Sequence, residues 1–478
     1  MANRMLRFIE LNKEMPDKRA VAERREDFLE IYDNFTDERA KEQSARCSQC
    51  GIPFCQVHCP VHNNIPDWLM LTAEGRLEEA YEVSQATNNF PEICGRICPQ
   101  DRLCEGNCVI EQSDHGTVTI GSIERYINDT AWENGWVKPV KPSQERGESV
   151  GIVGAGPAGL AAAEELRKLG YQVTVYDRYD RGGGLMIYGI PGFKLEKPVV
   201  ERRVQLLRDA GVEIKLNCEI GRDISLNELR NRHAAVLLAT GVYKARELRV
   251  PGVGSPGVVP ALDFLIASNR RDLGDKVAEI EDGSLWAKDK RVVVVGGGDT
   301  AMDCVRTAVR QGATSVRCLY RRDRANMPGS QREVANAEEE GIEFLWLSAP
   351  EAVMGSPTVS KLRAAKVHLG MPDATGRQTP QILENSSFDI EADLVIKALG
   401  FDPEDLPRLF GEPGLEVSRW GTILIDNKTK MSRLPGVFAA GDIVRGASLV
   451  VWGIRDGRDA AASMHSFIQA GAQAVAAE

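Results

Sequence analysis

Cysteine side chains are the clearest candidates for chemistry in this sequence, and most of them lie near the N-terminus. Eight of the eleven cysteines form two short runs: Cys47, Cys50, Cys55 and Cys59, then Cys94, Cys98, Cys104 and Cys108. Thiolates are soft ligands that suit iron–sulfur clusters, zinc or copper(I), so the spacing has to choose among them. In ferredoxins a C-x2-C-x2-C-x3-C-P run gives three cysteines to one four-iron cluster and the last cysteine to another. The first run keeps the x3-Cys-Pro ending but has a gap of four residues where ferredoxins have two.

This pattern predicts two four-iron clusters whose ligands are shared between the runs. The predicted ligands are Cys47, Cys50, Cys55 and Cys108 for the first cluster, and Cys59, Cys98 and Cys104 for the second, whose fourth ligand by the count of cysteines is Cys94. Structural zinc is the main alternative, because Cys-x2-Cys is common to both chemistries. The Cys-Pro ending favours iron–sulfur. Disulfides are not expected, because the charged segment 1–19 lacks the apolar stretch of a signal peptide.

A glycine-rich turn after the cysteine runs has the surroundings that a dinucleotide site needs. An apolar strand over 149–153 leads into Gly154-Ala155-Gly156-Pro157-Ala158-Gly159, and a helical segment over 160–169 follows. In such a G-x-G-x-x-G fingerprint, the glycines allow a tight turn, close approach of the pyrophosphate and close helix packing. The helix N-terminus then faces the phosphates. The next strand, 172–176, ends at Asp177, where an acid is expected to bind ribose hydroxyls.

Later segments favour FAD as the ligand of this first turn. Gly182-Gly183-Gly184-Leu185 follows Asp177 closely, Ala239-Thr240-Gly241 ends another apolar strand, and Gly441-Asp442 ends a third. In this order they resemble the FAD-binding elements of flavoproteins with two dinucleotide domains. That likeness implies that Asp442 contacts the ribitol and pyrophosphate region. The predicted FAD residues are Gly154, Gly156, Gly159, Asp177, Gly184, Leu185, Gly241, Gly441 and Asp442.

A second glycine-rich turn predicts a nicotinamide site. The strand 291–295 is all valine after its first residue and leads into Gly296-Gly297-Gly298-Asp299-Thr300-Ala301. The next strand, 315–320, ends at Arg321-Arg322; an acid there would bind a free 2′-hydroxyl, whereas arginine accommodates the 2′-phosphate of NADP. The predicted NADPH residues are Gly296, Gly298, Asp299, Thr300, Ala301, Arg321 and Arg322. No side chain is assigned a catalytic role, because the cofactors carry the hydride and electron chemistry.

These motifs define the expected organisation of the 478 residues. A helical iron–sulfur domain over 1–145 precedes an α/β region of two doubly wound dinucleotide-binding domains. The FAD domain covers 146–250 and 405–478, and the NADPH domain, 251–404, is inserted between its two parts as in disulfide reductases. Within the helical domain, apolar residues with i, i+3, i+4, i+7 spacing predict an amphipathic helix over 28–35.

Composition limits the possible partners. The formal net charge of −10 argues against nucleic acid. No uninterrupted apolar run approaches the roughly 18 residues of a membrane-spanning helix. A cytoplasmic protein that binds neither nucleic acid nor membrane is therefore expected.

Over essentially the whole chain, these segments resemble the small (beta) subunit family of bacterial NADPH-dependent glutamate synthase. The likeness is carried by the segments 46–55, 87–92, 188–191, 298–303 and 446–452. The same module is similar to the N-terminal half of dihydropyrimidine dehydrogenase, in which one cluster ligand is a glutamine beyond the second cysteine run. The corresponding residue here is Glu124. The resemblance therefore implies Glu124 as the eighth ligand, which we slightly favour, whereas the count of cysteines gives Cys94.

The resemblance also implies a function. An electron-input subunit with FAD and two 4Fe-4S clusters would oxidise NADPH. Within a hetero-oligomer, it would pass electrons to a large (alpha) subunit that makes L-glutamate from L-glutamine and 2-oxoglutarate. Because electrons must leave through the clusters, the partner surface is expected on the cluster domain. Two alternatives stay open: a stand-alone or differently partnered NADPH:ferredoxin-type oxidoreductase, and a zinc-bearing binding module without activity.

Overall fold

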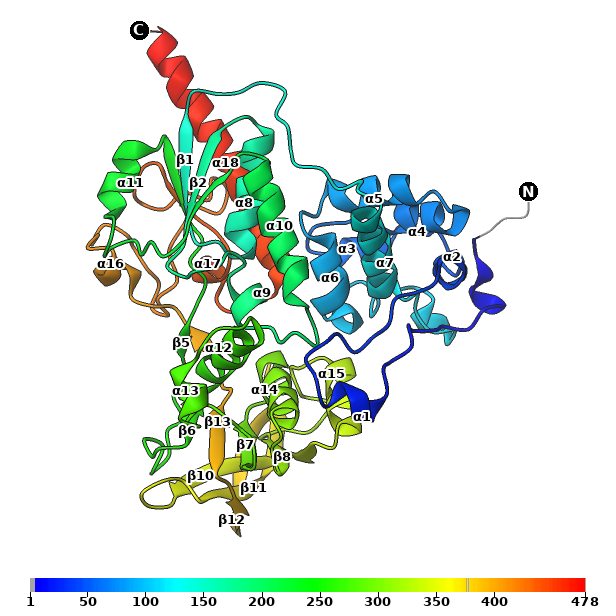
Figure 1. Cartoon of the computed structure of the whole chain (residues 1–478), viewed down its shortest axis with the longest axis vertical. Helices are drawn as coiled ribbons and strands as arrows, with labels where there is room; N and C mark the ends of the chain where they lie inside the picture. The colour runs from blue at the N-terminus through cyan, green and yellow to red at the C-terminus, as the bar shows by residue number, and fades with distance from the viewer. Residues whose placement is uncertain (1–4, 375, 377, 478) are drawn as a thin grey trace.

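The computed structural model describes residues 5–374, 376 and 378–477, which form three domains (Figure 1). The first part of the chain, in blue, forms a helical domain at one side. Two α/β domains lie beside it, and in this view the one that contains β1 stands above the one that contains β7. Within the described residues, no helix is both long enough and apolar enough to cross a membrane.

Short helices joined by cysteine-bearing loops build the helical domain. They are α1 (Val21–Arg24), α2 (Asp37–Ala45), α3 (Phe54–Val57), α4 (Ile65–Glu74), α5 (Leu77–Ala86), α6 (Pro91–Ile97) and α7 (Ile120–Glu133), with 3-10 turns at Arg7–Ile9, Gln100–Arg102 and Glu111–Ser113. Thr36 caps α2 by accepting a hydrogen bond from the backbone N–H of Arg39. Helix α4 ends at Gly75, whose φ of +80° is left-handed. Trp68 and Ile123 are fully buried between these helices, which fixes the loops that carry the cysteines.

The amphipathic helix predicted over 28–35 is wrong. This segment is extended, and Lys18 and Tyr32 pair as an antiparallel bridge. Its apolar residues do not share one helix face but contact different domains: Phe28 lies 6.3 Å from the ring of Phe193, between ring centres, and Tyr32 reaches Asn336. The segment 28–35 is therefore an extended strap between domains, and its tertiary contacts explain why its apolar residues have helical spacing without forming a helix.

The first α/β domain has a five-stranded parallel sheet in the order β15-β4-β1-β2-β3. The strands are β1 (Ser149–Val153), β2 (Gln172–Tyr176), β3 (Glu213–Lys215), β4 (Ala235–Leu238) and β15 (Val437–Ala439). The helices are α8 (Pro157–Lys168), α9 (Leu185–Tyr188), α10 (Lys197–Asp209), α11 (Leu226–Arg232), α16 (Leu406–Leu409), α17 (Asp442–Arg445) and α18 (Val450–Ala477). Helices α8, α10 and α18 bury one face of the sheet, while α11 and α16 pack on the other. Because the strand order reverses between β1 and β4, a ligand crevice is expected at their carboxyl ends.

The second α/β domain repeats this plan with the order β6-β13-β7-β8-β9. Its parallel strands are β6 (Val258–Pro260), β7 (Arg291–Val295), β8 (Ser315–Leu319), β9 (Glu343–Leu345) and β13 (Leu394–Lys397), and its helices are α12 (Ala261–Asp272), α13 (Ala278–Glu281), α14 (Asp299–Arg310) and α15 (Gln331–Glu339). Val292 and Val294 face the helices, whereas Val293 and Val295 face a second, antiparallel sheet. Burial on both faces explains the unbroken valines of β7.

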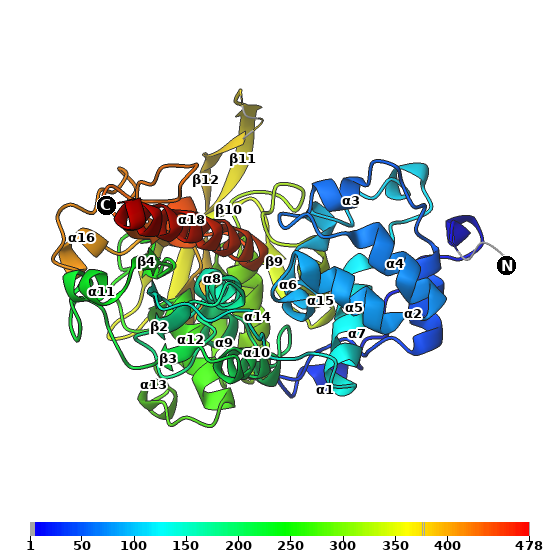
Figure 2. The same ribbon diagram turned by 90° about the horizontal axis from the view of Figure 1, so that it is seen from above.

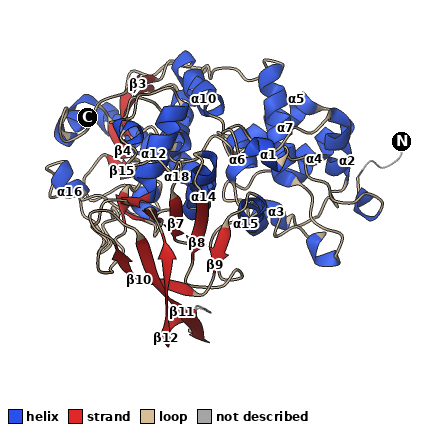
Figure 3. Ribbon diagram, turned by 60° about the horizontal axis from the view of Figure 1, so that its bottom comes forward, coloured by secondary structure: helices blue, strands red, loops and turns tan. Residues whose placement is uncertain are grey.

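That antiparallel sheet extends away from the body of the molecule (Figures 2 and 3). It consists of β10 (Ser348–Met354), β11 (Lys361–Pro372) and β12 (Gln378–Glu391). The chain passes between the two α/β domains at β5 (Lys244–Ala245) and returns at β14 (Phe401–Asp402), and these two short strands pair with each other. The second α/β domain is therefore an insertion in the first.

Candidate functional site

The two glycine-rich turns have the same geometry. Gly154 and Gly296 both have positive φ, of +109° and +154°, and a Cβ at either would lie 2.3 or 2.2 Å from a carbonyl oxygen at the end of the neighbouring strand. A Cβ at Gly156 or Gly298 would meet nothing within 4 Å. The first glycine of each turn is thus demanded by packing, and the second leaves open space where a pyrophosphate can approach the backbone. Gly159 allows the helix to pack, because its Cβ would lie 1.9 Å from the carbonyl oxygen of Gly154.

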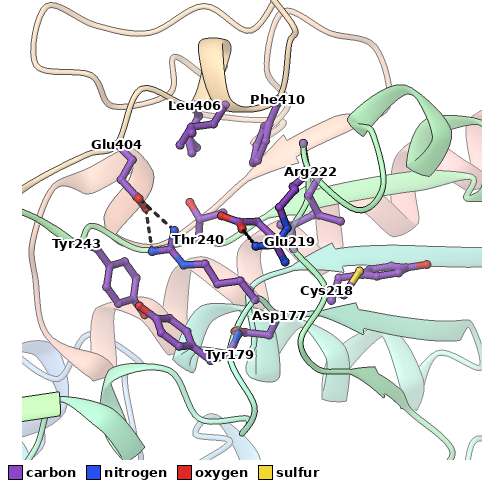
Figure 4. A pocket seen from close by; sticks show the side chains of 17 residues that line it. Asp177, Tyr179, Cys218, Glu219, Arg222, Thr240, Tyr243, Glu404, Leu406 and Phe410 are labelled. Carbon is purple, nitrogen blue, oxygen red and sulfur yellow. Dashed lines mark hydrogen bonds and ion pairs between the residues drawn. The ribbon is translucent and has the colours of Figure 1, made fainter. Parts of the chain in front are cut away.

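A cavity of about 320 Å³ opens at the carboxyl ends of the first parallel sheet (Figure 4). The carboxylate of Asp177 lies at its wall and accepts hydrogen bonds from the backbone N–H groups of Ala155, at 2.7 Å, and Tyr179, at 2.9 Å. Glu404 pairs with the guanidinium of Arg178 at 3.0 Å. This cavity has the place and the polar wall that the adenosine half of a dinucleotide needs.

A second cavity, of about 260 Å³, continues from the first and is lined by all three domains. It brings together eight of the nine predicted FAD residues: Gly154, Gly156, Asp177, Gly184, Leu185, Gly241, Gly441 and Asp442. The second α/β domain contributes Asp299 and Thr300, and the helical domain contributes Cys98. The hydroxyl of Thr240, which lines both cavities, is buried without a hydrogen-bond partner. Such an unsatisfied group at the wall of a cavity fits a site built for a ligand with hydroxyl or ring nitrogen atoms.

Asp442 stands at the start of α17, where that cavity meets the first glycine-rich turn. Burial raises the pKa of its carboxyl to about 6, while a hydrogen bond from the backbone of Ser448 opposes that shift. The first residues of α18 also line the cavity, so the N-terminus of this long helix lies at its wall. Hydroxyl donors from a ligand would satisfy the acid, and the helix terminus favours negative charge.

Arg321 and Arg322 follow β8 and lie outside both cavities. Within the described residues, neither guanidinium takes part in an ion pair, although this chain pairs many of its arginines. The Nε of Arg322 is buried without a hydrogen-bond partner. A pair of unpartnered guanidinium groups at the end of this strand fits an anion such as a nucleotide phosphate.

The four thiols predicted for the first cluster surround one small cavity: Cys47, Cys50, Cys55 and Cys108. Burial raises the pKa of Cys47 to about 11 and that of Cys55 to about 12. The hydroxyl of Ser48 lies 3.0 Å from Cys50 Sγ. Buried thiols of this kind give up their protons when positively charged iron binds them.

The thiols predicted for the second cluster surround a separate cavity, together with both candidates for the fourth position: Cys59, Cys98, Cys104, Cys94 and Glu124. Glu124 Oε1 accepts hydrogen bonds from the side-chain amides of Asn63 and Asn88, each at 3.4 Å. Burial raises its pKa to about 8. A buried carboxyl whose partners are only neutral amides fits a place beside a metal cation.

The arrangement of these ligands differs from that of a zinc site. Among the described residues, no three Cys, His, Asp or Glu side chains converge closely enough to hold a single metal ion. A zinc ion would draw four thiolate sulfurs to about 2.3 Å from one point. In a four-iron cluster each thiolate binds its own iron, so the sulfurs stand further apart. Two separate groups of four or five ligands around small cavities therefore fit clusters.

Cys98 is shared between two sites, because it lines both the second cluster cavity and the cavity at the carboxyl ends of the first sheet. Helix α6 ends immediately before it. One thiol of the second cluster cavity thus also forms part of the wall of the interdomain cavity.

Some residues at the site were not predicted from the sequence. Thr240 and Tyr243 line both large cavities, and Lys194 and Asp303, whose side chains pair at 2.8 Å, line the second, interdomain one. Thr240 stands beside the predicted Gly241, so that motif could have indicated it. The Lys194–Asp303 pair joins residues more than a hundred positions apart in different domains, and no local pattern indicates it.

Comparison with known proteins agrees with this geometry. Residues 24–136 match the family model of dihydropyrimidine dehydrogenase domain II, 4Fe-4S cluster, and residues 148–457 match that of pyridine nucleotide-disulphide oxidoreductase. The glutamate synthase [NADPH] small chain of Azospirillum brasilense is 71% identical, with 100% of both chains covered. The chain belongs to the glutamate synthase small chain family. The small chain of Escherichia coli K12 is 46% identical over 98% of this chain and 100% of its own length.

A solved structure shows the same fold at low identity. The Mycobacterium tuberculosis protein FprA in complex with NADPH has a TM-score of 0.59 and 20% identity, covering 69% of this chain and 86% of its own. Together with the family matches, this confirms the predicted α/β fold behind an iron–sulfur domain. Family membership confirms an NADPH-dependent oxidoreductase with FAD, NADPH and 4Fe-4S cofactors. The zinc-bearing module without activity is thereby excluded.

Proposed function

We propose that this chain is the electron-input subunit of a glutamate synthase. It would oxidise NADPH and pass electrons through two four-iron clusters to a large subunit that makes L-glutamate from L-glutamine and 2-oxoglutarate. The observation that carries this proposal is the double position of Cys98, at the wall of the interdomain cavity of about 260 Å³ and in the second cluster cavity. We propose the cytoplasm as its location.

The described residues support a proposed place for each part of FAD. Asp177 would hold the ribose hydroxyls, the open space at Gly156 would take the pyrophosphate, and Asp442 would accept hydrogen bonds from the ribitol. Bound there, FAD supplies the exchange of a two-electron hydride for single electrons. The protein's contribution is to hold the ring between Cys98 and the second α/β domain and to place the N-terminus of α18 beside it.

NADPH would approach from the second α/β domain. Gly298 leaves room for its pyrophosphate, while Arg321 and Arg322 would pair with the 2′-phosphate. Thr300, at the start of α14, lines the shared cavity, where it would direct the nucleotide towards the flavin position. The unpaired state of both arginines supports NADPH over NADH, because a free guanidinium fork matches a phosphate.

The first cluster position is the expected exit to the large subunit, because the second position faces the flavin cavity. Four apolar side chains are exposed on the segments that carry the cysteines of the first cluster cavity: Ile52 (69% exposed), Phe54 (47%), Val57 (54%) and Val109 (40%). Phe54 and Val109 also line that cavity. We define these four residues as the apolar cap. Exposed apolar side chains gathered in one place are typical of protein interfaces, and the curated relatives are named as small chains. The apolar cap therefore supports a large-chain partner at this surface.

Anaerobic mixing of the purified chain with NADPH or NADH tests the proposal. Flavin absorbance should bleach faster with NADPH, and the iron–sulfur absorbance should follow. A chain without flavin or iron colour, or one that NADH reduces faster, would contradict it. Co-purification with a glutamine-hydrolysing large chain should succeed for the wild type and fail for Phe54→Asp. A chain that reduces a ferredoxin and never captures a large chain would instead support the differently partnered oxidoreductase.

A further inference from the structure

The loop that carries two ligands of the second cluster also touches the second α/β domain. Between Cys98 and Cys104, the guanidinium Nη2 of Arg102 donates to the backbone carbonyls of Met327 and Gly329, both at 2.9 Å. On the same loop, the carboxylate of Asp101 accepts hydrogen bonds from the hydroxyl of Ser330 and from the backbone N–H of Gln331, each at 3.3 Å. Four hydrogen bonds thus connect the cluster loop to the segment 327–331.

The segment 327–331 is in turn bound to the second glycine-rich turn. The backbone N–H of Gly329 donates to the carbonyl of Gly297 at 2.9 Å, and that of Ser330 donates to Asp299 Oδ1 at 2.9 Å. The packing is close, because a Cβ at Gly329 would lie 3.3 Å from the Gly297 oxygen. The segment therefore supports the residues that would hold the nucleotide pyrophosphate.

We infer that the second cluster's loop positions the NADPH-binding turn, and that Asp101 and Arg102 are positioning residues for nucleotide binding. This inference rests on the proposed function of that turn. The contacts form an unbroken series from the cluster ligands through 98–104 and 327–331 to Gly297 and Asp299. A turn held in its binding conformation before the ligand arrives binds more tightly, because less ordering remains to be done.

The position of these contacts predicts how their loss changes the binding of NADPH and of NADH. They reach the turn that faces the pyrophosphate, which NADPH and NADH share, and not the guanidinium of Arg322. Loosening the turn should therefore weaken both nucleotides by the same factor and leave their ratio unchanged. Losing Arg322 should change the ratio.

Calorimetric titration of the full chain, purified anaerobically with its flavin and iron, tests this with NADP⁺ and NAD⁺ as probes. Asp101 and Arg102 are exposed, so replacing them leaves no cavity in the core. We expect the double variant Asp101→Ala/Arg102→Ala to bind both nucleotides about tenfold more weakly, within the usual range of coupling between sites. Arg102→Lys, tested alone, should keep most of the affinity, because its ammonium can still donate to these carbonyls.

A matched control is Lys18→Ala, which breaks another contact between domains. Lys18 pairs at 2.8 Å with Glu339, near the far end of α15 from the turn, and its loss should leave nucleotide affinity unchanged. Unchanged affinity in the double variant, or a change in the NADP⁺ to NAD⁺ ratio, would overturn the inference. If the wild type binds neither nucleotide, the proposed function fails instead, so the two failures are distinguishable.

Discussion

The pair Glu92–Arg203 joins the helical domain to the first α/β domain, and breaking it should disturb both stability and electron transfer. Arg203 of α10 donates from Nε and Nη2 to the two carboxylate oxygens of Glu92 on α6, at 2.8 and 2.7 Å. The two side chains are 1% and 0% exposed. The guanidinium also lies over the ring of Trp132, 5.2 Å from its centre.

The burial of the Glu92–Arg203 pair decides how much stability is lost when the pair is broken. Removing one partner of a buried pair leaves an uncompensated charge, which costs about 3–5 kcal/mol. Replacing both partners with apolar residues of similar volume is often neutral. We therefore expect Glu92→Gln to destabilise the domain interface by about 3 kcal/mol or more and Glu92→Met/Arg203→Met by much less. The exposed pair Arg76–Glu79 serves as a control, because ion pairs on the surface contribute little to stability.

Urea unfolding followed by tryptophan fluorescence measures the loss, since Trp132 lies at this interface. Stopped-flow mixing with NADPH adds a functional measurement. Helix α6 leads directly into Cys98, so a displaced α6 should slow the reduction of the clusters while flavin reduction stays unchanged. If Glu92→Gln costs no more than the loss of the exposed pair, or if the double variant is the least stable, the reasoning is wrong.

Four further predictions concern single side chains. Burial raises the pKa of Asp442 to about 6, so the carboxylate acceptor is lost as the pH drops through about 6, and FAD retention, measured by the fluorescence of released flavin, should fall. Asp442→Asn should flatten this pH dependence, and identical profiles for the two proteins would contradict the prediction. Burial lowers the pKa of Lys197 to about 7 in the folded protein, so above pH 7 the unfolded chain binds one proton more than the folded chain, and the stability of the wild type should rise from pH 7 towards 10. In urea unfolding, Lys197→Met should be about 3 kcal/mol more stable than the wild type at pH 7 and should lose this pH dependence. Arg322→Ala should raise KM for NADPH about thirtyfold and leave that for NADH within a factor of two, and an equal rise for both would refute the phosphate role. Glu124→Ala should lower the iron content by one cluster while Cys94→Ala keeps it, and the reverse result would make Cys94 the eighth ligand.

The two glycine-rich turns could be predicted because each depends on a local pattern. Gly154 and Gly296 are required by contacts with a strand end, whereas Gly156 and Gly298 border open space. Strand, turn and helix follow one another within about twenty residues, so neighbouring sequence carries the information. The cysteine runs could be interpreted in the same way, since their spacing predicts two groups of thiols, and the structure gathers these groups around two cavities.

Contacts between domains could not be predicted in this way. The extended strap at 28–35 has helical spacing, yet Phe28 and Tyr32 contact different partners across the domain boundary. Lys194 and Asp303 meet only because one domain is inserted in the other. Such pairs have no sequence period, and tertiary packing overrides the local pattern that the strap displays.

The arrangement of the three domains gives the redox sites a common physical requirement. If the proposed function is right, Cys98 has to stay against the second, interdomain cavity for electrons to leave it, and Asp299 has to stay at the same cavity for the nucleotide to reach it. These residues belong to different domains, so neither α/β domain alone fixes the distance between them. The buried Glu92–Arg203 pair holds one side of this assembly and the loop 98–104 holds the other. A change at either contact should therefore alter the redox sites even though it touches no cofactor position.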